Sequence, residues 1–148
     1  MQAKIREASE KDLPDILSLY SQLGMDKGQI LPIDKAKEIY DRIGTYPNYK
    51  IYVATVGESV VGVFALLVMD NLGHLGAPSG VIEDVVVDIS WRRKGIGKQM
   101  LRFAIECCRE AGCYKLALSS NLKRKDTHSF YKSLGFDMHG YSFKVEIN

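Results

Sequence analysis

The sequence lacks long apolar runs and any marked excess of charge. No apolar stretch approaches the roughly 20 residues of a membrane-spanning helix, and the N-terminus has no apolar core of the signal-peptide kind. Lysine and arginine number 20 against 18 acidic residues, so the formal net charge is +2. This balance does not favour nucleic acid or an anionic membrane surface as a partner. We therefore expect a cytoplasmic protein that binds neither.

Cysteine is scarce, and the three that are present do not suit a disulfide framework or a metal site. Cys107 and Cys108 are neighbours on one predicted helix, and Cys113 follows shortly after it. Their number is odd, and no histidine or cysteine lies at metal-ligand spacing. We expect reduced thiols that pack in the interior, and no metal.

The 148 residues are 46% hydrophobic and 26% charged, as in ordinary globular proteins. No repeat or low-complexity tract divides the chain. We therefore predict one domain over residues 1–148 with a single core.

The pattern of apolar residues predicts a mixed α/β (α+β) domain. The predicted strands cover residues 4–8, 50–56, 59–69, 80–88, 115–119 and 141–147. The predicted helices run from Ser9 or Asp12 to Gly24, from Asp34 to Gly44, from Ile96 to Gly112, and over residues 126–134. Because the strand at 80–88 is almost continuously apolar, we expect it to be central and covered on both faces.

The segment between this strand and the next helix has the most informative pattern. It reads Arg92-Arg93-Lys94-Gly95-Ile96-Gly97-Lys98. The first amide N–H groups of a helix have no intrahelical acceptor and lie at the positive end of the helix dipole. Glycines let the backbone approach a ligand closely, so such a turn can surround a phosphate with main-chain donors. We predict that this turn binds a phosphorylated cofactor.

Two other phosphate-binding motifs are excluded by position. A Walker loop needs a glycine five residues before the Gly-Lys pair and Ser or Thr after it, where this chain has Arg92 and Gln99. A dinucleotide-binding fingerprint needs a third glycine where this chain has Met100. The pattern that fits is Arg-x-x-Gly-x-Gly over residues 92–97.

With this motif and this order of predicted elements, the chain resembles the GNAT superfamily of acyl-coenzyme A-dependent N-acyltransferases. The resemblance implies a single-domain GNAT fold, in which helices flank a central, mixed, mostly antiparallel sheet. It also implies acetyl-coenzyme A as the acyl-donor cosubstrate. The backbone of Val85, Val86 and Val87 would bind the pantetheine arm, and residues 92–98 would bind the phosphates. At Arg93 the family more often has glycine.

The resemblance extends to Asn121 and to the run Phe-Tyr-x-x-Leu-Gly-Phe at residues 130–136. It implies that Tyr131 binds the coenzyme A sulfur and acts as general acid toward the leaving thiolate. Asn121 would bind the pantetheine or nearby backbone. A phenol with a pKa of about 10 suits protonation of a thiolate. The alternative is that Tyr131 only belongs to the buried side of a short helix.

Two acids, Glu83 and Asp84, interrupt the apolar strand. Only the free base of an amine attacks a thioester, so a carboxylate can serve as base, directly or through water, and partial burial would raise its pKa. Because side chains alternate along a strand, we expect the two acids on opposite faces of the sheet. We name Glu83 as the base, with Asp84 as the alternative and a structural ion pair as the other interpretation.

One segment is similar to a subfamily, the aminoalkylphosphonate N-acetyltransferases. It reads Ser119-x-Asn121-x-Lys123-Arg124-x-Asp126-x-His128-x-Phe130-Tyr131. The acceptor itself stays open, and residues 20–34 and 70–80 are expected to line its pocket, with Tyr20 among the candidate contacts.

We predict acetyl transfer to a primary amine of a small molecule, by direct attack in a ternary complex. The alternatives are a protein acetyltransferase acting on an N-terminus or a lysine, and a non-catalytic acyl-coenzyme A sensor. The oligomeric state is open, with a homodimer among the options.

Overall fold

The structure, a computed structural model, describes residues 2–120 and 122–147. The chain divides into two compact units, Met1–Ala117 and Leu118–Asn148, and each is described by itself. No helix in the described ranges is both long and apolar enough to span a membrane.

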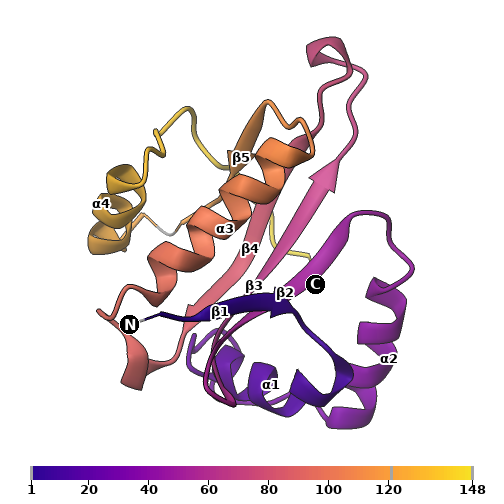
Figure 1. The fold of residues 1–148 in the computed structure, drawn as a ribbon, viewed down its shortest axis with the longest axis vertical. Coiled ribbons are helices and arrows are strands. Elements are labelled where there is room, and N and C mark those ends of the chain that lie inside the picture. Colours follow the sequence, from indigo (N-terminus) through magenta and orange to yellow (C-terminus); the bar gives the residue numbers. More distant parts are fainter. Residues whose placement is uncertain (1, 121, 148) are drawn as a thin grey trace. The chain divides into compact units, whose positions relative to one another are not determined.

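The first unit is a five-stranded sheet with helices on both faces (Figure 1). The strand order is β1-β2-β3-β4-β5; the first four strands are antiparallel and β5 is parallel to β4. These features confirm the predicted mixed, mostly antiparallel sheet. Its elements are β1 (Lys4–Glu7), η1 (Glu10–Asp12), α1 (Leu13–Ser21), α2 (Ile33–Ile43), β2 (Tyr49–Val56), β3 (Ser59–Met69), η2 (His74–Gly76), β4 (Ser79–Val87), η3 (Ile89–Trp91), α3 (Ile96–Glu110) and β5 (Lys115–Ala117).

Apolar side chains cover the sheet on both faces. On one face, Ile16 and Leu19 of α1 pack with residues of β2, β3 and β4 that are at most 2% exposed: Val53, Val63 and Val86. On the other face, Phe103 of α3 contacts Tyr52, with ring centroids 5.1 Å apart, and Tyr52 stacks on Phe64 at 5.3 Å. The prediction that β4 is covered on both faces is confirmed.

Two glycines let α3 pack close to the sheet. A Cβ atom at Gly62 of β3 would lie 2.7 Å from the Met100 sulfur, and one at Gly80 of β4 would lie 2.4 Å from the Cys108 sulfur. The buried stripe of α3 includes Leu101 and Cys108, whereas Cys107 is half-buried and Ala111 is exposed. The helix ends at Glu110, before Ala111 can reach the sheet.

The start of α1 is held by a capping box and an ion pair. The Asp12 carboxylate accepts a hydrogen bond from the Ser9 amide at 2.7 Å and two from the Arg6 guanidinium at 2.7 and 2.9 Å. Asp12 is the N-cap of α1, which is one of the two starts that the sequence left open. For α2 the prediction was wrong by two residues, since Pro32 is the N-cap and Asp34 lies in the first helical turn.

The second unit contains one described helix, α4 (Lys125–Ser133), close to the predicted 126–134. The predicted strand at 141–147 is wrong, because this segment has no regular secondary structure. Its alternating apolar side chains, from Tyr141 to Ile147, are at least 79% exposed. Alternation supplies an apolar face, but a strand also needs a partner for its backbone groups. Among the described residues of this unit no strand offers one.

The Arg6–Asp12 pair predicts acid sensitivity. Hydrogen bonds from Arg6 lower the pKa of Asp12 to about 2. A carboxyl group whose pKa is lower in the folded than in the unfolded protein stabilises the fold at pH values above its ordinary pKa. This stabilisation is lost as the pH falls through the lowered pKa. We expect Asp12→Asn to reduce the free energy of unfolding by about 2 kcal/mol at neutral pH, and the difference from wild type to vanish as pH falls from about 4 to about 2.

Urea unfolding across this pH range measures the effect. The control is Glu58→Gln in the exposed turn between β2 and β3. A difference between Asp12→Asn and wild type that does not change with pH would contradict the assignment.

Candidate active site

A bulge in β4 shapes the centre of the candidate site. Along the pairing with β3, Ala65 is opposite Glu83 while Val63 is opposite Val86, so three residue steps on β4 face two on β3. Asp84 has a left-handed φ of 53°. Such a bulge leaves backbone groups outside the ladder and redirects side chains.

The bulge places both acids on the α1 face of the sheet. Ala65 and Val63 are two residues apart and share a face, so their partners Glu83 and Val86 share it too. Asp84 acts electrostatically on Tyr20 of α1, which lies on this face. The prediction that Glu83 and Asp84 point to opposite faces is therefore wrong, because the bulge interrupts the alternation. Both side chains are also exposed rather than partly buried.

Two tyrosines lie within electrostatic reach of these acids. Burial raises the pKa of Tyr20, and the charge of Asp84 raises it further. Burial, then Asp84 and Glu83, raise the pKa of Tyr49. Both phenols therefore stay protonated at neutral pH and can donate a hydrogen bond to a carboxylate or accept one from an amine.

Sequence reasoning named Tyr20 but missed Tyr49. Tyr49 is opposite Leu67 of β3, and Leu67 is opposite Val81 of β4. This register puts Tyr49 on the same face as Glu83, level with Val81, which lies two positions before Glu83 in β4. Only the pairing of three strands reveals this relation, and no local motif signals it.

Beside the bulge, one edge of β4 has no strand partner among the described residues, and we call it the open edge. Its pairing with β5 is confined to Ser79, Gly80 and Val81. Within the first unit, residues 82–87 therefore have no strand partner on that side, and Asp84 and Val85 also have no register partner on β3. An extended ligand can pair with such an edge through its amide groups. Val86 itself is buried on the α1 face, so only its backbone is available.

The turn that follows β4 has the geometry of an anion-binding helix start. Arg93 and Gly95 have left-handed φ values of 61° and 82°, so the backbone bends twice within three residues. The first hydrogen bond of α3 joins the Gln99 amide to the Gly95 carbonyl at 3.1 Å. The amides of Ile96, Gly97 and Lys98 therefore have no acceptor within the helix. Gly95 is required for its φ rather than for space, since a Cβ there would lie 3.9 Å from its nearest neighbour.

Two of the four basic side chains near this turn stabilise the turn itself. The Arg92 Nε donates a hydrogen bond to the Val87 carbonyl at 3.2 Å. The Lys94 Nζ lies 5.1 Å from the centre of the Trp91 ring, in a cation–π contact. Arg93 and Lys98 are exposed. The left-handed φ of Arg93 gives a physical reason why glycine suits this position.

Tyr131 belongs to the second unit. Its ring contacts Phe130 and Phe136, with centroids 5.6 and 5.9 Å away. Burial raises the pKa of the Tyr131 phenol, and the positive charge of Arg124 opposes this effect. The hydroxyl is thus protonated at neutral pH, as a proton donor must be. Asn121 lies outside the described residues.

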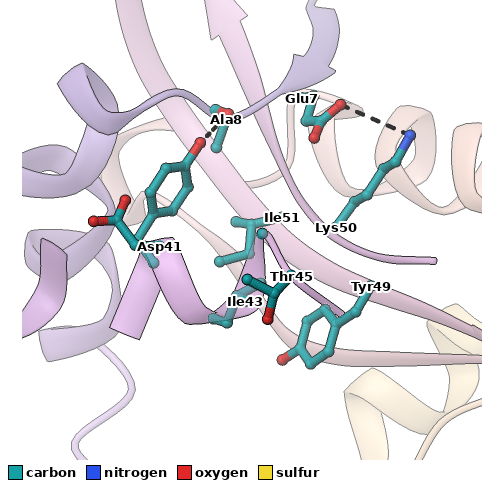
Figure 2. A pocket seen from close by; sticks show the side chains of 10 residues that line it. Glu7, Ala8, Asp41, Ile43, Thr45, Tyr49, Lys50 and Ile51 are labelled. Carbon is teal, nitrogen blue, oxygen red and sulfur yellow. Dashed lines mark hydrogen bonds and ion pairs between the residues drawn. The ribbon is translucent and has the colours of Figure 1, made fainter. Parts of the chain in front are cut away.

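A pocket of about 300 Å³ lies between the end of β1, α2 and the start of β2 (Figure 2). The Tyr40 hydroxyl donates a hydrogen bond to the Ala8 carbonyl at 2.9 Å, and Lys50 pairs with Glu7 at 3.8 Å. None of the site residues predicted from the sequence lines it. Tyr49 lines the pocket and is also the tyrosine whose pKa is raised by burial and by the charges of Asp84 and Glu83.

Comparison with known proteins decides the family. The model of the acetyltransferase (GNAT) family matches residues 14–136. The chain belongs to the GNAT family. The match extends over both units and includes the bulged strand, the glycine turn and α4. GNAT acetyltransferases take their acetyl group from acetyl-coenzyme A.

Among GNAT relatives, the glucosamine 6-phosphate N-acetyltransferase of Trypanosoma brucei brucei is 36% identical over 88 residues, which are 60% of this chain and 58% of that protein. The aminoalkylphosphonate N-acetyltransferase of Salmonella typhimurium (strain LT2) is 35% identical over 97 residues, which are 66% of this chain and 62% of that protein. The chain thus spans about three-fifths of the length of these two relatives.

A solved structure from Agrobacterium tumefaciens str. C58, assigned to the acetyltransferases, superposes with a TM-score of 0.92. It is 31% identical and covers 97% of this chain and 99% of its own. The predicted GNAT fold is therefore confirmed.

The placement of both acids beside Tyr49 is testable without any ligand. Removing the two negative charges in Glu83→Gln/Asp84→Asn should lower the pKa of Tyr49, because both charges raise it. A titration of the protein with carbon-13-labelled tyrosine, followed by NMR, measures this value. Each single variant should produce part of the change, and Glu58→Gln should produce none. No response of Tyr49 to either single variant would contradict the shared face.

Proposed function

We propose that this protein transfers an acetyl group from acetyl-coenzyme A to a primary amine of a small molecule, by direct attack in a ternary complex. The observation that carries the proposal is the bulged β4, whose open edge at residues 82–87 is followed through η3 by the turn at 92–98. The family assignment and the small-molecule acceptors in the names of two relatives support it. We also propose that residues 1–148 act as one catalytic domain.

The residues present fit coenzyme A. The amides of Ile96, Gly97 and Lys98, which have no intrahelical acceptor, suit a pyrophosphate. Left-handed residues, as at Arg93 and Gly95, are common in backbone turns that bind anions. Arg92, Arg93, Lys94 and Lys98 supply positive charge around this turn. The backbone of Val85–Val87 at the open edge suits the amide groups of the pantetheine arm, although Arg92 already occupies the Val87 carbonyl. Asn121 would add a further contact to this arm.

The acetyl thioester supplies an activated acyl group, and residues of this chain accept and donate the protons. Glu83 or Asp84 accepts the proton that the ammonium form of the acceptor must lose, directly or through water. Both carboxylates are exposed on one face, so either can reach a bound amine. Tyr131, which is protonated at neutral pH, would donate its proton to the departing thiolate.

The proposed role of the turn predicts a specific loss of binding. Gly95→Val forces a β-branched residue to a φ of 82°, which costs at least about 1–2 kcal/mol for any residue with a Cβ. We expect coenzyme A affinity to fall by about tenfold or more in titration calorimetry.

The matched control is Gly57→Val. Gly57 also has a left-handed φ, 60°, and has open space around its Cβ position, but it lies in the turn between β2 and β3. The Gly57→Val variant should lose about as much stability as Gly95→Val and keep its affinity for coenzyme A. Equal affinities for the two variants would show that the turn at 92–98 is only structural.

Removal of one hydroxyl tests the proposed general acid. Tyr131→Phe should lower kcat by about a hundredfold while it leaves coenzyme A affinity nearly unchanged, since the ring and its contacts with Phe130 and Phe136 remain. Tyr141→Phe, at an exposed tyrosine of the same unit, is the control. A Tyr131→Phe variant with wild-type turnover would remove this residue from the mechanism.

The experiment that tests the function as a whole is a thiol-release assay with acetyl-coenzyme A. The acceptors are polyamines, aminoalkylphosphonates, amino-sugar phosphates, aminoglycosides and peptides. Turnover with a small amine supports the proposal. Turnover with peptides alone would make the protein a peptide acetyltransferase, and tight binding of acetyl-coenzyme A without any turnover would make it a sensor.

A further inference from the structure

The side chain of Gln22 joins the end of α1 to the beginning of the glycine turn. Its Oε1 accepts a hydrogen bond from the Ile89 amide at 3.0 Å, and its Nε2 donates one to the Asp88 carboxylate at 3.3 Å. Gln22 is the C-cap residue of α1, and its own amide is bonded to the last turn of that helix. The bridge therefore connects two segments that are 66 and 67 residues apart in the sequence.

Asp88, which accepts one of the two hydrogen bonds of Gln22, is itself held by several others. Its amide donates to the Val61 carbonyl at 2.8 Å, and its carbonyl accepts from the Trp91 amide at 2.8 Å. Its carboxylate also accepts from the Ser90 amide at 2.8 Å, which caps the short helix η3. The carboxylate thus holds η3 on one side and Gln22 on the other, and η3 leads directly into the turn at 92–95.

Side-chain packing holds this segment only in part, since Trp91 alone of the η3 residues is half-buried. Ile89 is 68% exposed and Ser90 is exposed as well. Hydrogen bonds to backbone and carboxylate groups therefore contribute to its position. The two from Gln22 come from a different element, so they fix η3 relative to α1.

We propose that Gln22 is a positioning residue for the coenzyme-binding turn. This inference rests on the function proposed above. By holding η3 against α1, Gln22 keeps the amides of residues 96–98 in the arrangement that receives the pyrophosphate. Its loss lets the turn sample other positions, so binding of coenzyme A weakens while the proton-transferring residues are untouched.

The expected effect follows from the number of bonds lost. Two exposed hydrogen bonds at the lower end of the usual net contribution correspond to about a fivefold change in an equilibrium constant. Gln22→Ala should therefore raise the Kd for coenzyme A and the KM for acetyl-coenzyme A by about fivefold. The kcat should stay close to wild type, and Gln2→Ala, an exposed glutamine before β1, should change nothing.

A donor–acceptor exchange separates positioning from general loss of stability. Gln22→Glu keeps the oxygen that accepts from Ile89, but its carboxylate repels that of Asp88. In Asp88→Asn the side-chain NH2 group can face the NH2 group of Gln22, and two donors cannot form a hydrogen bond. Each single variant should weaken binding. In the double variant Gln22→Glu/Asp88→Asn, the asparagine amide can donate to the glutamate, its oxygen can still accept from Ser90, and affinity should return to within about twofold of wild type.

Titration calorimetry with coenzyme A, initial-rate kinetics and hydrogen exchange of the ligand-free chain make up the test. We expect faster amide exchange at residues 88–92 in each single variant and normal exchange in the double variant. Wild-type affinity in Gln22→Ala, or a double variant as weak as its parents, would overturn the inference. If wild type itself does not bind coenzyme A, the proposed function fails. In that case the exchange rates still test whether the Gln22 hydrogen bonds hold η3. Unchanged exchange in Gln22→Ala would show that they do not.

Discussion

The break in pairing between β3 and β4 is the constraint on which the rest of the site depends. Because Ala65 faces Glu83 while Val63 faces Val86, one residue of β4 is extra, and Asp84 takes a left-handed conformation. This single irregularity turns both carboxylates toward the α1 face, where Tyr20 and Tyr49 lie. It also removes backbone groups of Asp84 and Val85 from the ladder. An uninterrupted strand would keep those groups paired and would send one acid to the face covered by α3.

The packing of α3 fixes the other half of the proposed binding surface. Gly62 and Gly80 leave room for the Met100 and Cys108 sulfurs, so the helix lies close against β3 and β4. The Ala3 amide also donates a hydrogen bond to the Gln99 side chain at 2.9 Å, which ties the start of the sheet to the first turns of α3. A helix held this firmly presents its N-terminal amides at a constant place beside the end of β4. The turn between them is held by Arg92, Lys94 and Asp88 rather than by a buried core.

The sequence was sufficient for features that depend on local residues and insufficient for those that depend on strand pairing. The turn at 92–98 and the helix start at Ser9 or Asp12 are local, and both were predicted. The shared face of Glu83 and Asp84 depends on the register with β3, and the place of Tyr49 depends on two successive registers. The same limit explains the error at 141–147, where alternation alone indicated a strand. The roles of Tyr131 and Asn121 came from family resemblance and stay predictions.

Backbone hydrogen exchange with and without acetyl-coenzyme A tests the central claim most directly, because that claim concerns main-chain groups. We predict that ligand slows exchange at two separate segments, residues 82–87 on the open edge of β4 and residues 93–98 in the turn. Amides of β1 and α2, which lie outside the proposed binding surface, should exchange at unchanged rates. Binding without slower exchange at either segment would contradict the account, since the bulged strand and the glycine turn would then not receive the ligand.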